Sequence, residues 1–320
     1  MRALASPASL KGVLSAHEAS AALVDGFLAA GADAVPLPVA DGGEGTLAVL
    51  HDALGGDWRS ALVSDPLGRE VRARWLLLPD GKAAVESAEA IGLGRVGEDE
   101  RDVLRASSRG LGELIEAAID ARPAELIVFL GGTATVDGGA GLLEVVEALR
   151  VPTRAACDVR ARLLDAVSVF APQKGARPEQ LPELQRRLLA NALITPYRDL
   201  PGAGAAGGLG AALAALGAEL VEGAPLIMEL VGFRKRLNRS RLVVTGEGTV
   251  DRSTWMGKAP SAVLNASRAA GVHCVIFGGR VLERPDGVEL YELSGDPARA
   301  RQDLVELGKR LGATGSGRTA

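Results

Sequence analysis

Four short apolar runs in this chain each lead into a loop that combines glycine with an acidic residue. Runs of this length are typical of buried strands, and Asp-Gly pairs are typical of the turns that follow them. Glycine lets backbone N–H groups approach an anion, and carboxylates hold the metal ion that neutralises it. The pattern therefore favours an α/β fold whose strand ends carry a site for phosphate and a divalent cation. The four loops are 40–46 (ADGGEGT), 131–141 (GGTATVDGGAG), 157–159 (CDV) and 245–251 (TGEGTVD).

The order of the predicted elements indicates two domains. The 320 residues exceed the size at which a single core usually stops growing. Helices and strands alternate near both chain ends, which is typical of a parallel sheet. Residues 57–90 instead alternate in polarity between turn signals, which predicts an antiparallel meander. We expect one α/β domain from residues 1–55 and 225–320 and an inserted mixed α/β domain at 56–224, with a ligand cleft between them.

Individual elements can be placed from the periodicity of the apolar residues. Ser15 and Glu18 form a capping box that opens a helix. Further helices are expected at 107–121, 179–192, 205–221, 260–270 and 297–311, and strands at 35–39, 126–130, 241–245 and 272–277.

Charge and hydropathy exclude several classes of protein. The net charge is −4, from 36 basic and 40 acidic residues, and no basic stretch is long enough to indicate a nucleic-acid partner. No signal peptide and no apolar stretch of about 20 residues is present, so we expect no membrane partner and a cytoplasmic location. Cys157 and Cys274 lie in apolar runs and are interpreted as buried thiols.

The glycine-rich stretch 201–213 (PGAGAAGGLGAAL) has two interpretations. Gly202, Gly204 and Gly207 match G-x-G-x-x-G, but no strand precedes them, which excludes a dinucleotide-binding loop and hence a nicotinamide dehydrogenase. The stretch either binds an anion through free amides at a helix start, or consists of small residues that pack closely. The local sequence supports both equally.

Lysines and carboxylates recur beside glycine. Lys11, Lys174 and Lys258 each precede or adjoin a glycine in an otherwise Arg-rich chain, which suggests contact with a phosphate or a substrate carboxylate. A solvated surface lysine is the simpler alternative at each position. Each acidic loop, taken alone, is best explained as a turn. Together, converging carboxylates would repel one another unless a cation or a proton joined them.

Six segments together resemble the bacterial type I glycerate kinases. They are SPASLKGVLSA (6–16), PVADGGEGT (38–46), GGTATVDGGAG (131–141), FAPQKGA (170–176), PGAGAAGGLGAAL (201–213) and TGEGTVDRSTWMGKAP (245–260). The resemblance implies that the domain formed by the two chain ends is Rossmann-like. It also implies transfer of the γ-phosphate of ATP, with Mg²⁺, to a hydroxyl of D-glycerate, with 2-phosphoglycerate favoured over 3-phosphoglycerate as product.

The matched positions imply roles for individual residues. Asp137 would orient or deprotonate the substrate hydroxyl, and Lys11 and Lys258 would hold the glycerate carboxylate or the transferring phosphate. The remaining roles are substrate binding (Ser9, Asp41, Glu44 and Lys174), nucleotide binding (Gly202, Gly204, Gly207, Gly208, Gly246 and Gly248) and metal binding (Asp158, Glu247 and Asp251). The partners are D-glycerate and ATP, and the sequence leaves a homodimer open.

Some positions depart from the family pattern. Ala8 stands where the family has Asp, Leu10 where it has Phe, and Ser253 where it has Gln. The segment 158–162 lacks the family's Asn and Pro. Ala8 and the altered segment 160–162 favour a second hypothesis, a degenerate homologue that binds a nucleotide or an organic acid as a sensor. A purely structural protein is the poorest alternative, because it would not need the glycine–carboxylate loops.

Overall fold

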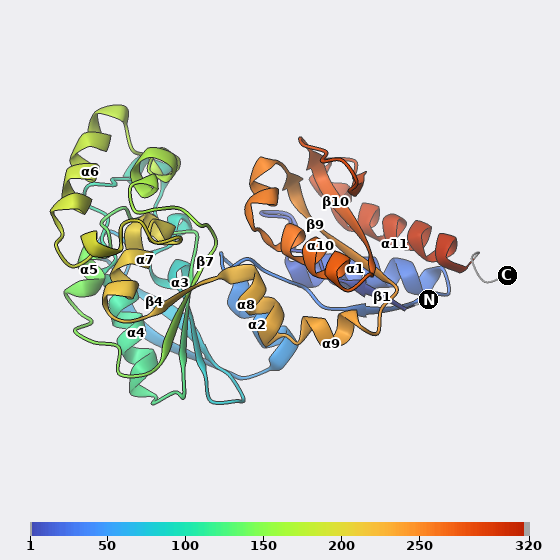
Figure 1. Cartoon of the computed structure of the whole chain (residues 1–320), viewed down its shortest axis with the longest axis horizontal. Coiled ribbons are helices and arrows are strands. Elements are labelled where there is room, and N and C mark those ends of the chain that lie inside the picture. The colour runs from blue at the N-terminus through green and yellow to red at the C-terminus, as the bar shows by residue number, and fades with distance from the viewer. Residues whose placement is uncertain (1, 317–320) are drawn as a thin grey trace. The chain divides into compact units, whose positions relative to one another are not determined.

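The computed structural model describes residues 2–316, which divide into two compact units (Figure 1). The terminal unit comprises residues 2–41, 48–53 and 224–316, and the inserted unit comprises residues 42–47 and 54–223. Segment 42–47 therefore belongs to the inserted unit, although the sequence placed it with the chain ends. The loop ADGGEGT is divided between the units after Asp41.

The terminal unit contains a five-stranded sheet in which all neighbouring strands are parallel, as the alternation of helices and strands predicted. The strand order is β11-β10-β9-β1-β2, and the strands are β1 (Arg2–Ala5), β2 (Asp33–Pro36), β9 (Leu242–Val250), β10 (His273–Val281) and β11 (Glu289–Glu292). From β1 the sheet continues to β2 on one side and to β9 and its successors on the other. The strand order thus reverses between β1 and β9, which is the position where open α/β sheets bind ligands.

Helices cover both faces of this sheet. The helices α1 (Ala16–Ala29) and α11 (Ala300–Ser316) share one core with the inward residues of the strands, among them Ala5, Val244 and Phe277. The helix α10 (Ala259–Ala269) packs against β9 and β10. The unit also contains α8 (Gly223–Leu230), α9 (Phe233–Leu237) and most of α2 (Thr46–Leu54).

Two local features explain how α1 begins and how it packs. The predicted capping box is confirmed, because Ser15 Oγ accepts a hydrogen bond from Glu18 N at 3.1 Å and Glu18 Oε2 accepts one from Ser15 N at 2.8 Å. Gly26 and Gly308 let α1 and α11 approach closely. A Cβ at Gly26 would lie 2.1 Å from the carbonyl oxygen of Val305, and one at Gly308 would lie 2.3 Å from that of Leu23.

The inserted unit contains a mixed six-stranded sheet in the order β3-β4-β5-β6-β7-β8. The antiparallel pairing of β3 with β4 and of β4 with β5 confirms the predicted meander, while β5 to β8 run parallel. The strands are β3 (Asp57–Ser64), β4 (Glu70–Leu77), β5 (Ala83–Glu86), β6 (Leu126–Leu130), β7 (Thr153–Cys157) and β8 (Glu219–Glu222). The helices are α3 (Ser87–Ile91), α4 (Arg109–Asp120), α5 (Ala140–Leu143), α6 (Leu181–Ala190) and α7 (Ala205–Ala215).

The predicted helix 205–221 is wrong over residues 216–221, and Ala206, Gly207 and Gly208 near its start have positive φ angles that are not helical. The helix α7 ends at Ala215, and Gly217 follows with a φ of +92°, a conformation that ends helices and favours glycine. Residues 219–222 then form β8, whose Leu220 pairs with Ala155 of β7. No helix within residues 2–316 is both long and apolar enough to cross a membrane.

Candidate active site

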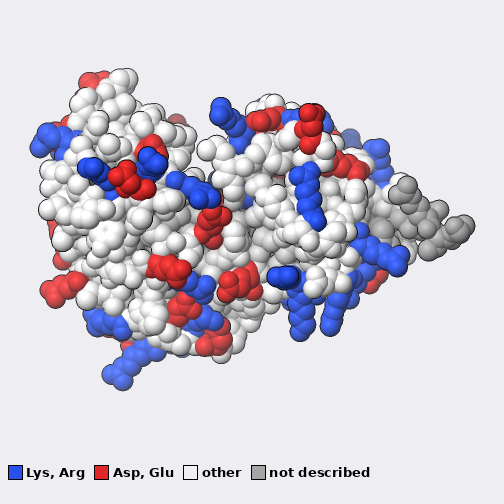
Figure 2. All heavy atoms as spheres, in the orientation of Figure 1, with Lys and Arg blue, Asp and Glu red and all other residues white. Residues whose placement is uncertain are grey.

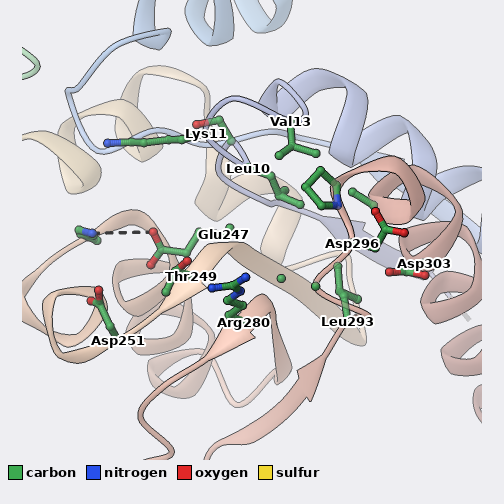
Figure 3. A pocket seen from close by; sticks show the side chains of 17 residues that line it. Leu10, Lys11, Val13, Glu247, Thr249, Asp251, Arg280, Leu293, Asp296 and Asp303 are labelled. Carbon is green, nitrogen blue, oxygen red and sulfur yellow. Dashed lines mark ion pairs between the residues drawn. The ribbon is translucent and has the colours of Figure 1, made fainter. Parts of the chain in front are cut away.

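A pocket of about 370 Å³ opens at the C-terminal ends of β1, β9 and β10, where the strand order reverses (Figure 3). It lies entirely within the terminal unit. Six of the residues predicted for the site line it: Ser9, Lys11, Glu247, Gly248, Asp251 and Lys258. They come from three separate parts of the chain, the loop after β1, the end of β9, and the segment that leads into α10.

Glu247 is the most buried of the charged groups that line the strand ends of this pocket. Its Oε1 accepts a hydrogen bond from Thr254 Oγ1 at 2.6 Å, and Lys258 Nζ lies 3.9 Å from its Oε2. Burial raises the pKa of Glu247, against the opposing effects of Thr254 and Lys258, and the negative charges of Asp41 and Asp251 raise it further. The three carboxylates thus influence one another within one unit. Binding of a cation would relieve their mutual repulsion.

Asp251 is held in place by the turn that follows it. Its Oδ1 accepts hydrogen bonds from Ser253 N at 2.8 Å and from Ser253 Oγ at 2.5 Å. The hydrogen bond from the Ser253 side chain is the largest cause of a lowered pKa of Asp251, so this carboxylate stays ionised. Ser253, which departs from the family's Gln, therefore supports a predicted metal ligand.

Arg280 is a pocket residue that the sequence did not reveal. It follows the expected strand 272–277, but β10 continues to Val281 and pairs Arg280 with Thr249 of β9. Figure 3 shows Glu247, Asp251 and Arg280 on one side of the pocket, and Leu293, Asp296 and Asp303 on the other. The stretch FGGRV, with two adjacent glycines, gives no local signal for this extension, which depends on the pairing of β10 with β9.

Two glycines of β9 were predicted to bind the nucleotide. Gly248 lines the pocket, whereas Gly246 packs against the neighbouring strand. A Cβ at Gly248 would meet Leu10 Cα at an ordinary 3.5 Å. A Cβ at Gly246 would lie 2.2 Å from the carbonyl oxygen of Phe277, its partner on β10. Close packing of β9 on β10 explains Gly246, and the nucleotide-binding role expected for it has no support in its contacts.

A second group of predicted residues meets within the inserted unit, around Lys174. This side chain is only 9% exposed. Its Nζ donates to Thr133 Oγ1 at 3.0 Å and to the carbonyl oxygen of Thr135 at 2.8 Å. Burial lowers the pKa of Lys174 to about 8, against the opposing effect of the Asp158 and Asp137 carboxylates. The predicted lysine thus carries a desolvated charge beside two predicted acids.

The loop after β6 brings Glu44 and Asp158 close to the same place. A Cβ at Gly131 would lie 2.7 Å from Gly43 Cα and 3.1 Å from Asp158 Oδ2, and one at Gly132 would lie 3.8 Å from Glu44 Cβ. Only glycine at position 131 therefore allows this approach. Three loops of the inserted unit, from residues far apart in sequence, converge at the C-terminal ends of its parallel strands.

Asp137 has a structural explanation that the sequence did not give. Its Oδ2 accepts hydrogen bonds from Ser108 N and Ser108 Oγ, both at 2.8 Å, and from Gly141 N at 3.2 Å. Its Oδ1 accepts one from Gly139 N at 3.1 Å. These four bonds tie the start of α4 to the turn that begins α5. Because its oxygens are engaged in this way, the expected role in deprotonating the substrate is not supported by the geometry.

The glycines of 202–208 lie in close contact with neighbouring groups. A Cβ would lie 2.8 Å from Cys157 Sγ at Gly202, 2.1 Å from the Arg162 carbonyl oxygen at Gly204, 1.9 Å from the Thr135 carbonyl oxygen at Gly207 and 2.8 Å from Gly138 Cα at Gly208. The amides of Gly202 and Gly204 donate to the carbonyl oxygen of Ala161 at 3.1 and 3.0 Å. Close packing therefore explains why these positions are glycine, and the phosphate-binding interpretation of the loop stays a prediction.

Glu86 is a buried carboxylate that the sequence analysis missed. It ends β5, is 4% exposed, and accepts hydrogen bonds from Gly45 N at 2.8 Å and from Leu47 N at 3.1 Å. Burial raises the pKa of Glu86 to about 7, against the effect of these two bonds, and the charges of Glu89 and Glu44 raise it further. Glu86 thus fixes the loop that carries Glu44. A single acid in the apolar run AAVESA was the available signal.

The donor set of the pocket suits Mg²⁺ bound together with phosphate. No group of three or more His, Cys, Asp or Glu side chains placed to hold a metal occurs within residues 2–316. Mg²⁺ is commonly held by one or two carboxylates together with substrate phosphates and water. Glu247 and Asp251 supply two carboxylates within one unit, and Asp158, the third predicted ligand, lies in the inserted unit.

The fold and the pocket define an α/β protein with a cavity, lined by cations and carboxylates, at the switch point of a parallel sheet. Comparison with known proteins specifies the family. A model of the glycerate kinase family matches residues 3–150 and 145–295. The chain belongs to this family, and it is a kinase.

Several relatives match over most of their length. The chain is 38% identical to a glycerate kinase of Bacillus subtilis (strain 168), over 88% of this chain and 85% of the relative. It is 37% identical to the glycerate 2-kinase of Escherichia coli (strain K12), over 84% and 82%. A crystal structure from Salmonella typhimurium LT2, provisionally assigned as glycerate kinase 2, matches with a TM-score of 0.83 and 32% identity over 99% of this chain and 98% of that one.

Proposed function

We propose that this protein transfers the γ-phosphate of ATP to the 2-hydroxyl of D-glycerate, producing 2-phosphoglycerate and ADP. The observation that carries the proposal is the switch-point pocket, where predicted cations and carboxylates from three chain segments line one cavity. The names of the Bacillus subtilis and Escherichia coli relatives support glycerate as the acceptor, and the second supports the 2-position. We propose a cytoplasmic location as well.

The pocket would hold the triphosphate by charge. Lys11, Lys258 and Arg280 line it and can neutralise phosphate oxygens, while Glu247 and Asp251 would hold Mg²⁺. The ion, when bound, neutralises charge on the phosphates. Gly248 and Ser9 line the same cavity and leave room for the ligand beside the backbone.

The inserted unit would supply contacts to the acid substrate. We assign substrate binding to Lys174 and Glu44, and a further acidic contact to Asp158, because these groups converge at one set of strand ends. Lys174 already makes two hydrogen bonds, so its orientation is fixed before a carboxylate arrives. Asp41 acts on Glu247 and is assigned to the metal side of the site.

No side chain is assigned as a general base. The transition state of phosphoryl transfer is loose, so catalysis consists mainly of positioning and of neutralising charge on the transferred group. Lysines and carboxylates placed before the reaction serve both purposes. Asp137 instead holds the start of α4 and α5 in position.

The test is turnover with the proposed substrates. The full chain is incubated with D-glycerate, ATP and Mg²⁺, ADP release is followed by a coupled assay, and ³¹P NMR identifies the product. Lys258→Ala is the pocket variant, and Lys309→Ala, which changes an exposed lysine on α11, is the matched control. We expect 2-phosphoglycerate from the wild type and the control, and a strong loss in the pocket variant. A 3-phosphoglycerate signal would refute phosphorylation at the 2-hydroxyl. An absence of product would refute the proposed transfer of phosphate from ATP to D-glycerate.

One observation favours the sensor as a second candidate. Ala8 N donates to the carbonyl oxygen of Gly246 at 2.9 Å, so position 8 lies next to β9 beside Glu247. The family's Asp at this position would add a carboxylate there, and Ala8 removes it. In the altered segment, Arg160 pairs with Glu222 at 3.0 Å. A sensor would bind ATP or D-glycerate in calorimetry without releasing ADP.

A further inference from the structure

The terminal unit has a second pocket, at the opposite edge of its sheet. Its volume is about 250 Å³, and it is lined by Arg2, Leu4, Val35, Lys235, Arg236, Arg239 and Ser240. Arg2 is the first residue of β1, and Ser240 shortly precedes β9. The pocket therefore lies at the N-terminal ends of these strands, whereas the candidate active site lies at their C-terminal ends. None of its lining residues belongs to the proposed catalytic machinery.

Positive charge is concentrated around this second pocket. The segment 234–241 (RKRLNRSR) contains five basic residues and no acidic one, although the chain as a whole has a net charge of −4. Figure 2 shows Lys and Arg side chains gathered over α9, which belongs to this segment. Arg2 pairs with Asp33 at 3.7 Å, while Lys235 and Arg239 form no ion pair within residues 2–316. Like charges that line one pocket repel one another, and a bound anion would offset the repulsion.

The pocket is also structured enough to recognise a small ligand. Leu4 and Val35, neighbours in register on β1 and β2, line it together with the basic residues. The Arg236 guanidinium donates to the carbonyl oxygen of Val231, and Ser240 Oγ donates to that of Arg236 at 2.9 Å. These bonds fix the segment that presents Lys235 and Arg239. Arginine forks match the geometry of phosphate oxygens.

We propose that this pocket binds a small phosphorylated molecule, at a site separate from the active site. Its volume suits a small ligand. Its basic residues converge on one cavity, whereas a nucleic acid would require a long basic stripe. The proposal does not depend on which acid the enzyme phosphorylates. It needs only that Arg2, Lys235, Arg236 and Arg239 face one bound anion.

Isothermal titration calorimetry with inorganic pyrophosphate tests this site in about 0.15 M salt, where charge effects beyond a Debye length are screened. The full chain carries Lys258→Ala throughout, which weakens phosphate binding at the switch point. Lys235→Gln with Arg239→Gln removes two charges from the second pocket. Arg105→Gln with Lys309→Gln removes two exposed charges elsewhere and is the matched control.

We expect the control to bind one pyrophosphate. The pocket variant should bind at least about tenfold more weakly or show no binding at all. Equal binding by the pocket variant and the control would overturn the proposal, as would an equal loss in both, which would indicate general electrostatics. Every protein in this experiment carries Lys258→Ala. Binding by the control together with a loss in the pocket variant therefore separates this site from the active site, even if the protein shows no turnover of D-glycerate.

Discussion

Replacing Glu86 by Gln should change how the stability of the inserted unit depends on pH. Burial raises the pKa of Glu86 from 4.5 to about 7, so the folded chain keeps a proton that the unfolded chain releases. Its contribution to stability is present below pH 4.5 and is lost as the pH rises through 7. A shift of this size corresponds to about 3 kcal/mol, at 1.36 kcal/mol for each pH unit.

The glutamine variant should lack this pH-dependent term. Its amide stays neutral, but only one of its two polar atoms is an acceptor, so either Gly45 N or Leu47 N loses its partner. That loss costs about 1–3 kcal/mol at every pH. We therefore expect the variant to be less stable than the wild type near pH 4.5, and as stable or more stable near pH 8.

Urea unfolding followed by tryptophan fluorescence measures this difference. Trp58 and Trp75 lie on β3 and β4 of the same sheet as Glu86. Trp255, which lies in the terminal unit, is replaced by Phe in every protein compared, so that the signal reports on the inserted unit. Glu70→Gln, an exposed acid on β4, is the control and should run parallel to the wild type. If the free-energy difference between wild type and Glu86→Gln stays constant from pH 4.5 to 8, the reasoning about burial of this carboxylate is refuted.

Three further changes probe the pocket of the terminal unit, the hydrogen bonds of Asp137 in the inserted unit, and the packing of α1 on α11. Lys258→Ala should lower kcat/KM by about two orders of magnitude with an unchanged melting temperature, because it removes a charge that we propose faces the transferred phosphate; normal kinetics would make Lys258 structural. Asp137→Asn should lower the free energy of unfolding by about 1–3 kcal/mol and change kcat less than about tenfold; a kcat loss of about two to four orders without destabilisation would restore the general base. Gly308→Ala should lower the melting temperature, because a Cβ there would lie 2.3 Å from the Leu23 carbonyl oxygen; circular dichroism on heating would show no change if α1 and α11 could separate freely.

The sheets and the capped helix could be predicted because their signals are local. Apolar runs between turn residues indicated the parallel strands, and alternating polarity between turn signals indicated the meander. The spacing of Ser15 and Glu18 alone specified the start of α1. The strand β8 was missed because an Ala-rich helix precedes it and only Gly217 marks the change. The extension of β10 to Arg280 depends on its pairing with β9, which no local pattern encodes.

The contacts of the glycine-rich loop could not be predicted, because they involve distant residues. G-x-G-x-x-G has the same local appearance whether its glycines approach a phosphate or a neighbouring carbonyl group. In this protein Gly204 meets Arg162 and Gly207 meets Thr135, and these contacts depend on how the two segments fold together. Glu86 was missed for a similar reason, since the amides that it accepts from lie about forty residues earlier in the chain.

The number of hydrogen-bond donors distinguishes the carboxylate of Asp137 from that of Glu247, which lines the pocket of the terminal unit. Asp137 accepts four hydrogen bonds, and their donors already supply the stabilisation that its charge requires. Glu247 is also buried, but it accepts one hydroxyl bond and has a lysine at 3.9 Å, with two further acids acting on it. A buried carboxylate with so few donors is costly unless a cation or a proton joins it. Loops that combine glycine with an acid therefore serve two purposes: the donors around Asp137 satisfy its carboxylate, whereas the carboxylate of Glu247 would gain from a bound cation.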